Sequence, residues 1–178
     1  MTPDCDQQPG KPADPDPAAW GERLAGAYRE IGDRAMRDLP IFNDALCVEA
    51  VGFRKLDGRI VGILVTPWFM NVVMDAHDRA LEHSPMQGSS LRFRFPAGDI
   101  DLAVSEIASA GRIASSSLFS PMFEFADMNA ARATAEAAFA ALMRPADDAE
   151  APRSRHQTPI GSIDRRNFLR GMLAERHG

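Results

Sequence analysis

Cysteine is scarce in this sequence. Two cysteines, Cys5 and Cys47, occur among 178 residues, and neither belongs to a Cys-x-x-Cys pair. This excludes a disulfide framework, a structural zinc site, a rubredoxin-type iron site and a thioredoxin motif. Cys47 falls in a predicted strand, where a free cysteine is usually a small buried hydrophobe. A nucleophilic or redox-active Cys47 would need a neighbouring base, and no sequence pattern supplies one.

Long apolar runs are also absent. No stretch approaches the roughly 20 apolar residues of a membrane-spanning helix. The first 17 residues hold four acids and one lysine, whereas a secretory signal starts with basic residues and an apolar stretch. We therefore expect a cytoplasmic protein without a membrane anchor. The net charge of −5 argues against nucleic acid as a partner.

Patterns typical of catalysis and cofactor binding are missing as well. The sequence has neither a P-loop nor a Rossmann glycine motif. Its four histidines show no metal-ligand spacing, and the serines at 115–117 lack the glycines of a nucleophile elbow. The expectation is a protein that is not an enzyme and that holds no metal or cofactor.

Composition divides the chain into three parts. Residues 1–16 are predicted to form a disordered acidic tail and residues 145–178 a mobile basic tail, because both are poor in large apolar residues. Residues 17–144 suffice for one domain with a core. Within the basic tail, residues 153–178 hold six arginines against two acids, a net charge of +4.

Two amphipathic helices are predicted. The first spans 17–39, between an Asp16 N-cap and Pro40, with apolar residues at three- to four-residue spacing. The second spans 127–143, with Asp127 as its N-cap and an alanine-rich apolar face.

Five strands are predicted from their apolar patterns: 46–56, 59–66, 91–95, 100–104 and 113–119. The first two flank Asp57-Gly58, a two-residue hairpin signal. The second is apolar on both faces. This predicts a central strand covered on two sides, or covered on one side and bound by something on the other. Short connections favour an α+β fold, a two-layer sandwich whose mostly antiparallel five-stranded sheet carries both helices on one face.

Two segments, 65–74 and 118–127, leave a strand at a proline and continue with methionine and aromatic residues. Methionine adapts to varied apolar partners, so one hypothesis is that both corners line a shared apolar groove. The alternative is that they fill the core between helix and sheet. The groove hypothesis names six floor residues: Trp68, Phe69, Met70, Phe119, Met122 and Phe125.

Four motifs of the chain resemble those of a known family: VTPWFMN (65–71), FPAGD (95–99), SLFSPMFEFAD (117–127) and RRNFLRG (165–171). The family is HybE, the assembly chaperones of [NiFe] hydrogenases. The resemblance implies a cytoplasmic protein with a fold similar to that of type III secretion chaperones. It implies binding to the small-subunit precursor and its twin-arginine signal peptide before export, and in some members to the large-subunit precursor. Some relatives have cysteine where this chain has Ser116, which argues against a redox or iron-ligand role there.

A signal peptide of this kind is basic and then apolar, so its receptor needs carboxylates beside an apolar surface. Glu124 and Asp127 are candidate partners for its arginines. Each has an alternative interpretation, a solvated loop charge for Glu124 and a helix cap for Asp127.

The C-terminal motif also resembles a twin-arginine export motif, with Arg165 and Arg166 followed by Phe168 and Leu169. It cannot direct export, because no apolar region follows it. Three interpretations of the motif stay open. It belongs to a basic mobile tail, it forms a short helix docked on its own domain, or it mimics the client's signal peptide. The sequence as a whole predicts an assembly and proofreading chaperone. The alternative is a small redox accessory enzyme or a large-subunit maturation factor that uses Cys47.

Overall fold

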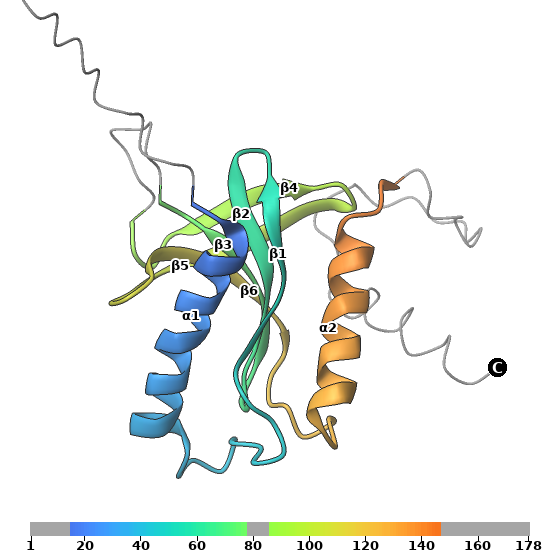
Figure 1. The fold of residues 1–178 in the computed structure, drawn as a ribbon. Coiled ribbons are helices and arrows are strands. Elements are labelled where there is room, and N and C mark those ends of the chain that lie inside the picture. The colour runs from blue at the N-terminus through green and yellow to red at the C-terminus, as the bar shows by residue number, and fades with distance from the viewer. Residues whose placement is uncertain (1–14, 78–85, 147–178) are drawn as a thin grey trace, which may run out of the picture.

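A six-stranded antiparallel sheet forms the centre of the molecule in the computed structural model, which describes residues 15–77 and 86–146 (Figure 1). The strand order is β1-β2-β3-β6-β5-β4. The strands are β1 (Glu49–Leu56), β2 (Arg59–Val65), β3 (Met70–Asp75), β4 (Ser90–Phe95), β5 (Gly98–Ile107) and β6 (Gly111–Phe119). The acidic tail, apart from its last two residues, and the basic tail beyond residue 146 lie outside the described residues.

The first hairpin forms where the sequence predicts it. Asp57 and Gly58 join β1 to β2 with φ angles of 47° and 76°. Positive φ at both positions suits a tight turn whose twist matches that of the strands. Asp57-Gly58 therefore fixes the register of the two strands.

Two α-helices flank the sheet, α1 (Pro17–Ile31) and α2 (Met128–Leu142). Both predicted N-caps are confirmed: Asp16 accepts a hydrogen bond from the Ala19 amide at 3.3 Å, and Asp127 one from Ala130 at 2.8 Å. The first helix is shorter than the predicted 17–39, because a π-helix, η1 (Gly32–Met36), follows Ile31. No helix in the described part of the chain is long and apolar enough to cross a membrane.

The helices lie on opposite faces of the sheet (Figure 1). Leu64 of β2 belongs to the same buried cluster as Leu24 of α1. Its neighbours Ile63 and Val65 belong to the cluster that contains Phe139 of α2. Successive side chains of a strand point to opposite faces, so α1 and α2 cover opposite sides of β2. The α+β class and the antiparallel sheet are confirmed, but the prediction that both helices share one face is wrong.

One strand was not among the five predicted: β3 (Met70–Asp75), which lies between β2 and β6. Met70, Val72 and Met74 pack in the cluster that contains α2, and Val73 packs in the cluster that contains α1. A strand that is apolar on both faces shows no alternation, so its sequence carries no period-two signal.

The end of the sheet formed by β5 and β4 packs against the C-terminal end of α2. The Ala97 amide, in the turn between β4 and β5, donates a hydrogen bond to the Leu142 carbonyl oxygen at 3.1 Å. Phe95, at the end of β4, and Leu102, within β5, are fully buried in the cluster that contains α2. The largest core therefore lies between α2 and the curved sheet.

Candidate functional site at one end of the sheet

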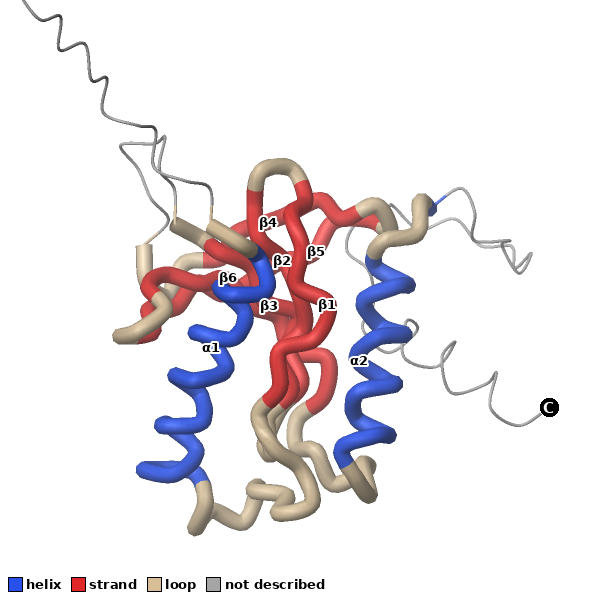
Figure 2. Tube along the Cα trace, in the orientation of Figure 1, coloured by secondary structure: helices blue, strands red, loops and turns tan. Residues whose placement is uncertain are grey.

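Three connections meet where α1 ends and α2 begins: the segment 37–48, the turn 66–69 and the segment 120–127. Figure 2 shows these loops gathered at one end of the molecule. Asn43 joins them. Its amide nitrogen Nδ2 donates to the carbonyl oxygens of Met122 at 3.0 Å and Phe125 at 2.9 Å. Its backbone amide donates to the Pro67 carbonyl oxygen at 3.0 Å.

Thr66 shapes the turn that follows β2. Its Oγ1 accepts hydrogen bonds from the amides of Trp68 at 3.3 Å and Phe69 at 2.9 Å, and donates to the Phe69 carbonyl oxygen at 2.9 Å. Thr66 is completely buried, and these bonds satisfy its hydroxyl. Ser120 ties the third connection to this turn, because its hydroxyl donates to the Trp68 carbonyl oxygen at 3.3 Å.

The two predicted groove segments do lie side by side, but most of the six floor residues face inward. Met70 and Met122 are 0% exposed, and Trp68 and Phe125 are 6% and 7% exposed. For these four the structure shows the core alternative. Phe69 and Phe119 are half-buried, and Phe119 packs edge-on against Phe125 with ring centroids 5.1 Å apart.

The two predicted acidic residues differ in role. Glu124 is exposed, and its side chain has no hydrogen bond or ion pair to another described residue. Asp127 is also exposed, but its carboxylate is engaged as the N-cap of α2. Its helix-cap alternative is therefore what the structure shows.

Apolar side chains that the sequence analysis did not select are exposed on the same loops. Leu39 is 44% exposed, Ile41 40% and Phe123 57%. Exposed large apolar residues on adjoining loops are candidates for an interaction site. Asp38 and Asp44 lie in the same connection as Leu39 and Ile41. Like Glu124, they are exposed and form no hydrogen bond or ion pair through their side chains to another described residue.

We call these six residues the loop surface: Asp38, Leu39, Ile41, Asp44, Phe123 and Glu124. The sequence placed Leu39 in the apolar stripe of a helix, and the early end of α1 puts it in a loop instead. No sequence signal separates the exposed Phe123 from the buried Met122 beside it, because the segment has no regular period.

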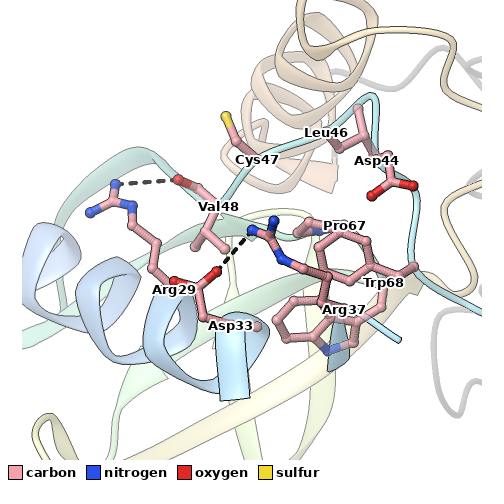
Figure 3. Close-up of a pocket in the computed structure, with 11 residues that line it drawn as sticks. Arg29, Asp33, Arg37, Asp44, Leu46, Cys47, Val48, Pro67 and Trp68 are labelled. Atoms are coloured by element: carbon pink, nitrogen blue, oxygen red, sulfur yellow. Dashed lines mark hydrogen bonds and ion pairs between the residues drawn. The ribbon is translucent and has the colours of Figure 1, made fainter. Parts of the chain in front are cut away.

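A pocket of about 260 Å³ lies beside the loop surface, between the end of α1 and the segment 42–48 (Figure 3). Phe42 stacks on Trp68 along one wall, with ring centroids 5.9 Å apart. Arg37 donates to Asp33 at 2.9 Å, and Arg29 donates to the Val48 carbonyl oxygen at 3.2 Å. Paired charges and an aromatic wall suit recognition of a polar segment of a protein partner.

Cys47 lies on the rim of this pocket and is exposed, one residue before Val48 and outside β1. The interpretation of Cys47 as a buried residue within a strand is therefore wrong. The predicted strand 46–56 begins three residues later, at Glu49. Figure 3 shows its sulfur pointing away from Asp33 and Arg37. Within residues 15–77 and 86–146, no group of three or more His, Cys, Asp or Glu side chains is arranged to hold a metal ion.

Burial changes one titratable group near the site. Desolvation raises the pKa of the Tyr28 phenol, which lies on α1 and packs edge-on against Phe69 with ring centroids 5.5 Å apart. This contact links the turn after β2 to the helix on the other side of the pocket.

Comparisons with known proteins match nearly all of the described domain. The sequence model of a family described as "[NiFe]-hydrogenase assembly, chaperone, HybE" matches residues 19–171. Hydrogenase expression/formation protein HupJ of Bradyrhizobium diazoefficiens is 66% identical over 165 residues, covering 93% of this chain and 95% of that protein. Protein HoxT of Cupriavidus necator is 37% identical over 161 residues, covering 83% and 86%.

One solved structure has the same fold. The solution structure of HybE from Escherichia coli matches with a TM-score of 0.59 over 85% of this chain and 92% of that one. The two sequences are 19% identical, so this likeness concerns the fold alone.

Proposed function

The chain belongs to the HybE family of [NiFe]-hydrogenase assembly chaperones, and from this premise we propose that it binds the precursor of a hydrogenase small subunit. In this proposal the chain acts in the cytoplasm and catalyses no reaction. It holds the twin-arginine signal peptide of the precursor until the metal centres are in place, and then releases the subunit for export.

The loop surface carries the proposal. A twin-arginine signal is basic and then apolar, and the loop surface offers three exposed carboxylates with three exposed apolar side chains. Carboxylates give charge-assisted hydrogen bonds to guanidinium groups, and large apolar side chains supply the buried area that affinity requires. The hydrogen bonds of Asn43 hold the two loops together, so the surface is formed before a client binds.

The test is direct binding of a synthetic signal peptide, measured by fluorescence anisotropy. Replacing Phe123 by Ala should weaken binding by about 2 kcal/mol, as loss of an anchor aromatic does. Stability should change little, since Phe123 is 57% exposed.

Met86→Ala is the matched control, because Met86 is 76% exposed. Met86 also lies away from the loop surface. The amide of nearby Gly88 donates a hydrogen bond to the Val104 carbonyl oxygen, and Val104 pairs across the sheet with Ala114. Ala114 pairs in turn with Met74, at the end of β3 that is remote from the loop surface. Equal binding by Phe123→Ala and the native chain would remove the loop surface from the client site. If a large-subunit precursor competes with the peptide for binding, the large subunit is a client as well.

Two substitutions at one residue separate the client role of Asp127 from its capping role. Asp127→Asn keeps a capping oxygen and removes the charge, whereas Asp127→Ala removes both. If the charge contacts the client, both variants weaken peptide binding and only Asp127→Ala loses stability, by about 1 kcal/mol. Unchanged binding by Asp127→Asn would leave Asp127 as a cap alone.

The rival function, a redox enzyme or large-subunit maturation factor that uses Cys47, has one observation in its favour, because the thiol is exposed beside a pocket. Cys47→Ala decides between the two functions. A chaperone that works through the loop surface should support hydrogenase maturation without the thiol. Loss of maturation in a normally folded Cys47→Ala chain would favour the rival.

A further inference from the structure

We propose that the C-terminal segment of the chain itself, centred on Arg165, Arg166, Phe168 and Leu169, docks on the loop surface and excludes the client from it. The docking rests on the charges of the two parts and on the length of chain that joins them. The exclusion of a client rests in addition on the proposed function.

Charge favours this occupant. Residues 153–178 carry six arginines against Asp164 and Glu175, a net charge of +4. Against them, Asp38, Asp44 and Glu124 are exposed without an ion pair to another described residue. Other charges near this end are already paired: Arg37 with Asp33, and Arg29 with Glu22. The loop surface therefore has three carboxylates that no described residue pairs with, and the segment has guanidinium groups that can pair with them.

The apolar parts also correspond. Phe168 and Leu169 follow the two arginines in the sequence, with a single asparagine between the two pairs. On the loop surface, Leu39, Ile41 and Phe123 are each exposed by 40% or more. Covering them would remove the largest exposed apolar side chains at this end of the described domain from water.

The chain is long enough to return to the loop surface. Helix α2 starts at this surface and has 15 residues, so its C-terminus is about 22 Å away at 1.5 Å per residue. From the last described residue, 146, to Arg165 there are 165 − 146 = 19 residues. Nineteen residues span up to about 60 Å when extended. A segment tethered in this way reaches the surface at an effective concentration of up to about 1 mM.

These quantities set the size of the effect on a client. If the segment binds its surface with a Kd of about 0.1 mM, an effective concentration of about 1 mM weakens client binding about tenfold. A weak internal ligand of this kind covers the apolar side chains when no client is present and yields to a tighter one.

The docking is tested in the full chain without any client. A nitroxide label is attached at Asn167→Cys in a chain that also carries Cys5→Ser and Cys47→Ser, and NMR signals of the backbone amides are compared with the label oxidised and reduced. Docking requires that the label broaden the amides of residues 38–44 and 122–126. Adding Arg165→Glu and Arg166→Glu should abolish this broadening. No broadening, broadening of another face, or broadening that persists after charge reversal would overturn the proposal.

Mixing distinguishes the chain's own segment from that of a second copy. Isotope-labelled chains without nitroxide are combined with unlabelled chains that carry it. Broadening in this mixture, of the same size as within one chain, would mean that a second copy supplies the segment and would overturn docking within one chain.

A second measurement tests exclusion. A synthetic signal peptide should bind the chain with Arg165→Glu and Arg166→Glu about tenfold more tightly than the native chain. Equal affinity would overturn exclusion while leaving the docking result intact. If the label broadens the loop surface but the peptide binds neither chain, docking stands and the proposed client is wrong.

Discussion

Single residues decide how closely the layers of this molecule approach. A Cβ atom at Gly62 of β2 would lie 2.5 Å from the ring of Phe53, and one at Gly21 of α1 would lie 2.8 Å from the same ring. The Phe53 ring therefore sits against both glycines, between the sheet and the helix. A real Cβ is essentially never found so close to another heavy atom, so this contact depends on the absence of a side chain.

Gly62→Ala should destabilise the fold by about 1–3 kcal/mol, because the added methyl group forces the Phe53 ring out of its packed position. The free energy of unfolding from urea titrations measures this. Gly26→Ala in α1 is the matched control. A Cβ there meets nothing within 4 Å, so removing a helix-interior glycine should stabilise the chain by about 0.5–1 kcal/mol. Equal effects of the two changes would contradict the packing described.

Asn43 acts at the same scale on the loops. Its side chain donates to Met122 and Phe125 and accepts from the Ala45 amide at 3.0 Å. Asn43→Ala removes all three hydrogen bonds and should cost about 2–3 kcal/mol of unfolding free energy, at about 1 kcal/mol per bond. The exposed neighbour Asp44 serves as control, since Asp44→Ala should change stability by less than about 0.5 kcal/mol. A native-like stability of Asn43→Ala would show that apolar contacts alone hold the loops together.

At the scale of the element, α1 sets the position of the turn after β2. Tyr28 of α1 packs on Phe69 of that turn, and a Cβ atom added at Gly32 of η1 would lie 3.3 Å from the Trp68 ring. Helix α2 is held near its N-terminal end by its cap and by Arg132, which donates to Glu49 of β1 at 2.6 Å and 2.7 Å. Helix α1 thus contacts the turn 66–69 and helix α2 follows the segment 120–127, so the two helices position two of the three loops from opposite sides of the sheet.

Tyr28 reports on the α1 contact, because it is the only tyrosine in the sequence. Burial raises the pKa of its phenol, so the folded chain holds this proton more tightly than the unfolded chain does. The protonated phenol therefore contributes to the free energy of unfolding. This contribution is complete below the ordinary pKa of about 10 and is lost as pH rises through the higher pKa of the folded state. An ultraviolet phenolate titration should show a higher midpoint in the native chain than in guanidinium chloride. Coinciding midpoints would contradict the burial.

Across the whole molecule, charge is divided unevenly along the chain. The net charge is −5 and residues 153–178 carry +4, so residues 1–152 carry −5 − 4 = −9. This imbalance favours a basic partner, whether the client or the chain's own C-terminal segment.

Binding of the signal peptide should therefore weaken as salt rises from about 0.05 M to 0.5 M, because screening shortens the range of surface electrostatics to a few ångströms. Anisotropy titrations at both salt concentrations measure this. A peptide with both arginines replaced by glutamine should bind more weakly and depend much less on salt. Equal affinity of the native peptide at both concentrations would contradict a role for the carboxylates of the loop surface.

The sequence by itself determined the features that depend on local chemistry. Asp57-Gly58 fixed the first hairpin through positive φ, and Asp16 and Asp127 fixed the helix starts by capping. The motifs around 65–71 and 117–127 indicated the family that the comparisons then showed. These signals survive in isolation, because each involves a few neighbouring residues.

Only the tertiary structure decided the features that depend on which surfaces meet. A strand buried on both faces has no alternation, so the residues of β3 gave no strand signal. For β2 the sequence left two alternatives open, and the structure shows the one in which both sides are covered. Exposure likewise depends on distant contacts. Met122 is buried and its neighbour Phe123 is 57% exposed, in a segment whose backbone is held by Asn43 from a distant loop. Leu39 lies beyond the end of α1 and Cys47 lies before β1, and both are exposed. The loop surface is therefore a product of long-range packing, which no local pattern encodes.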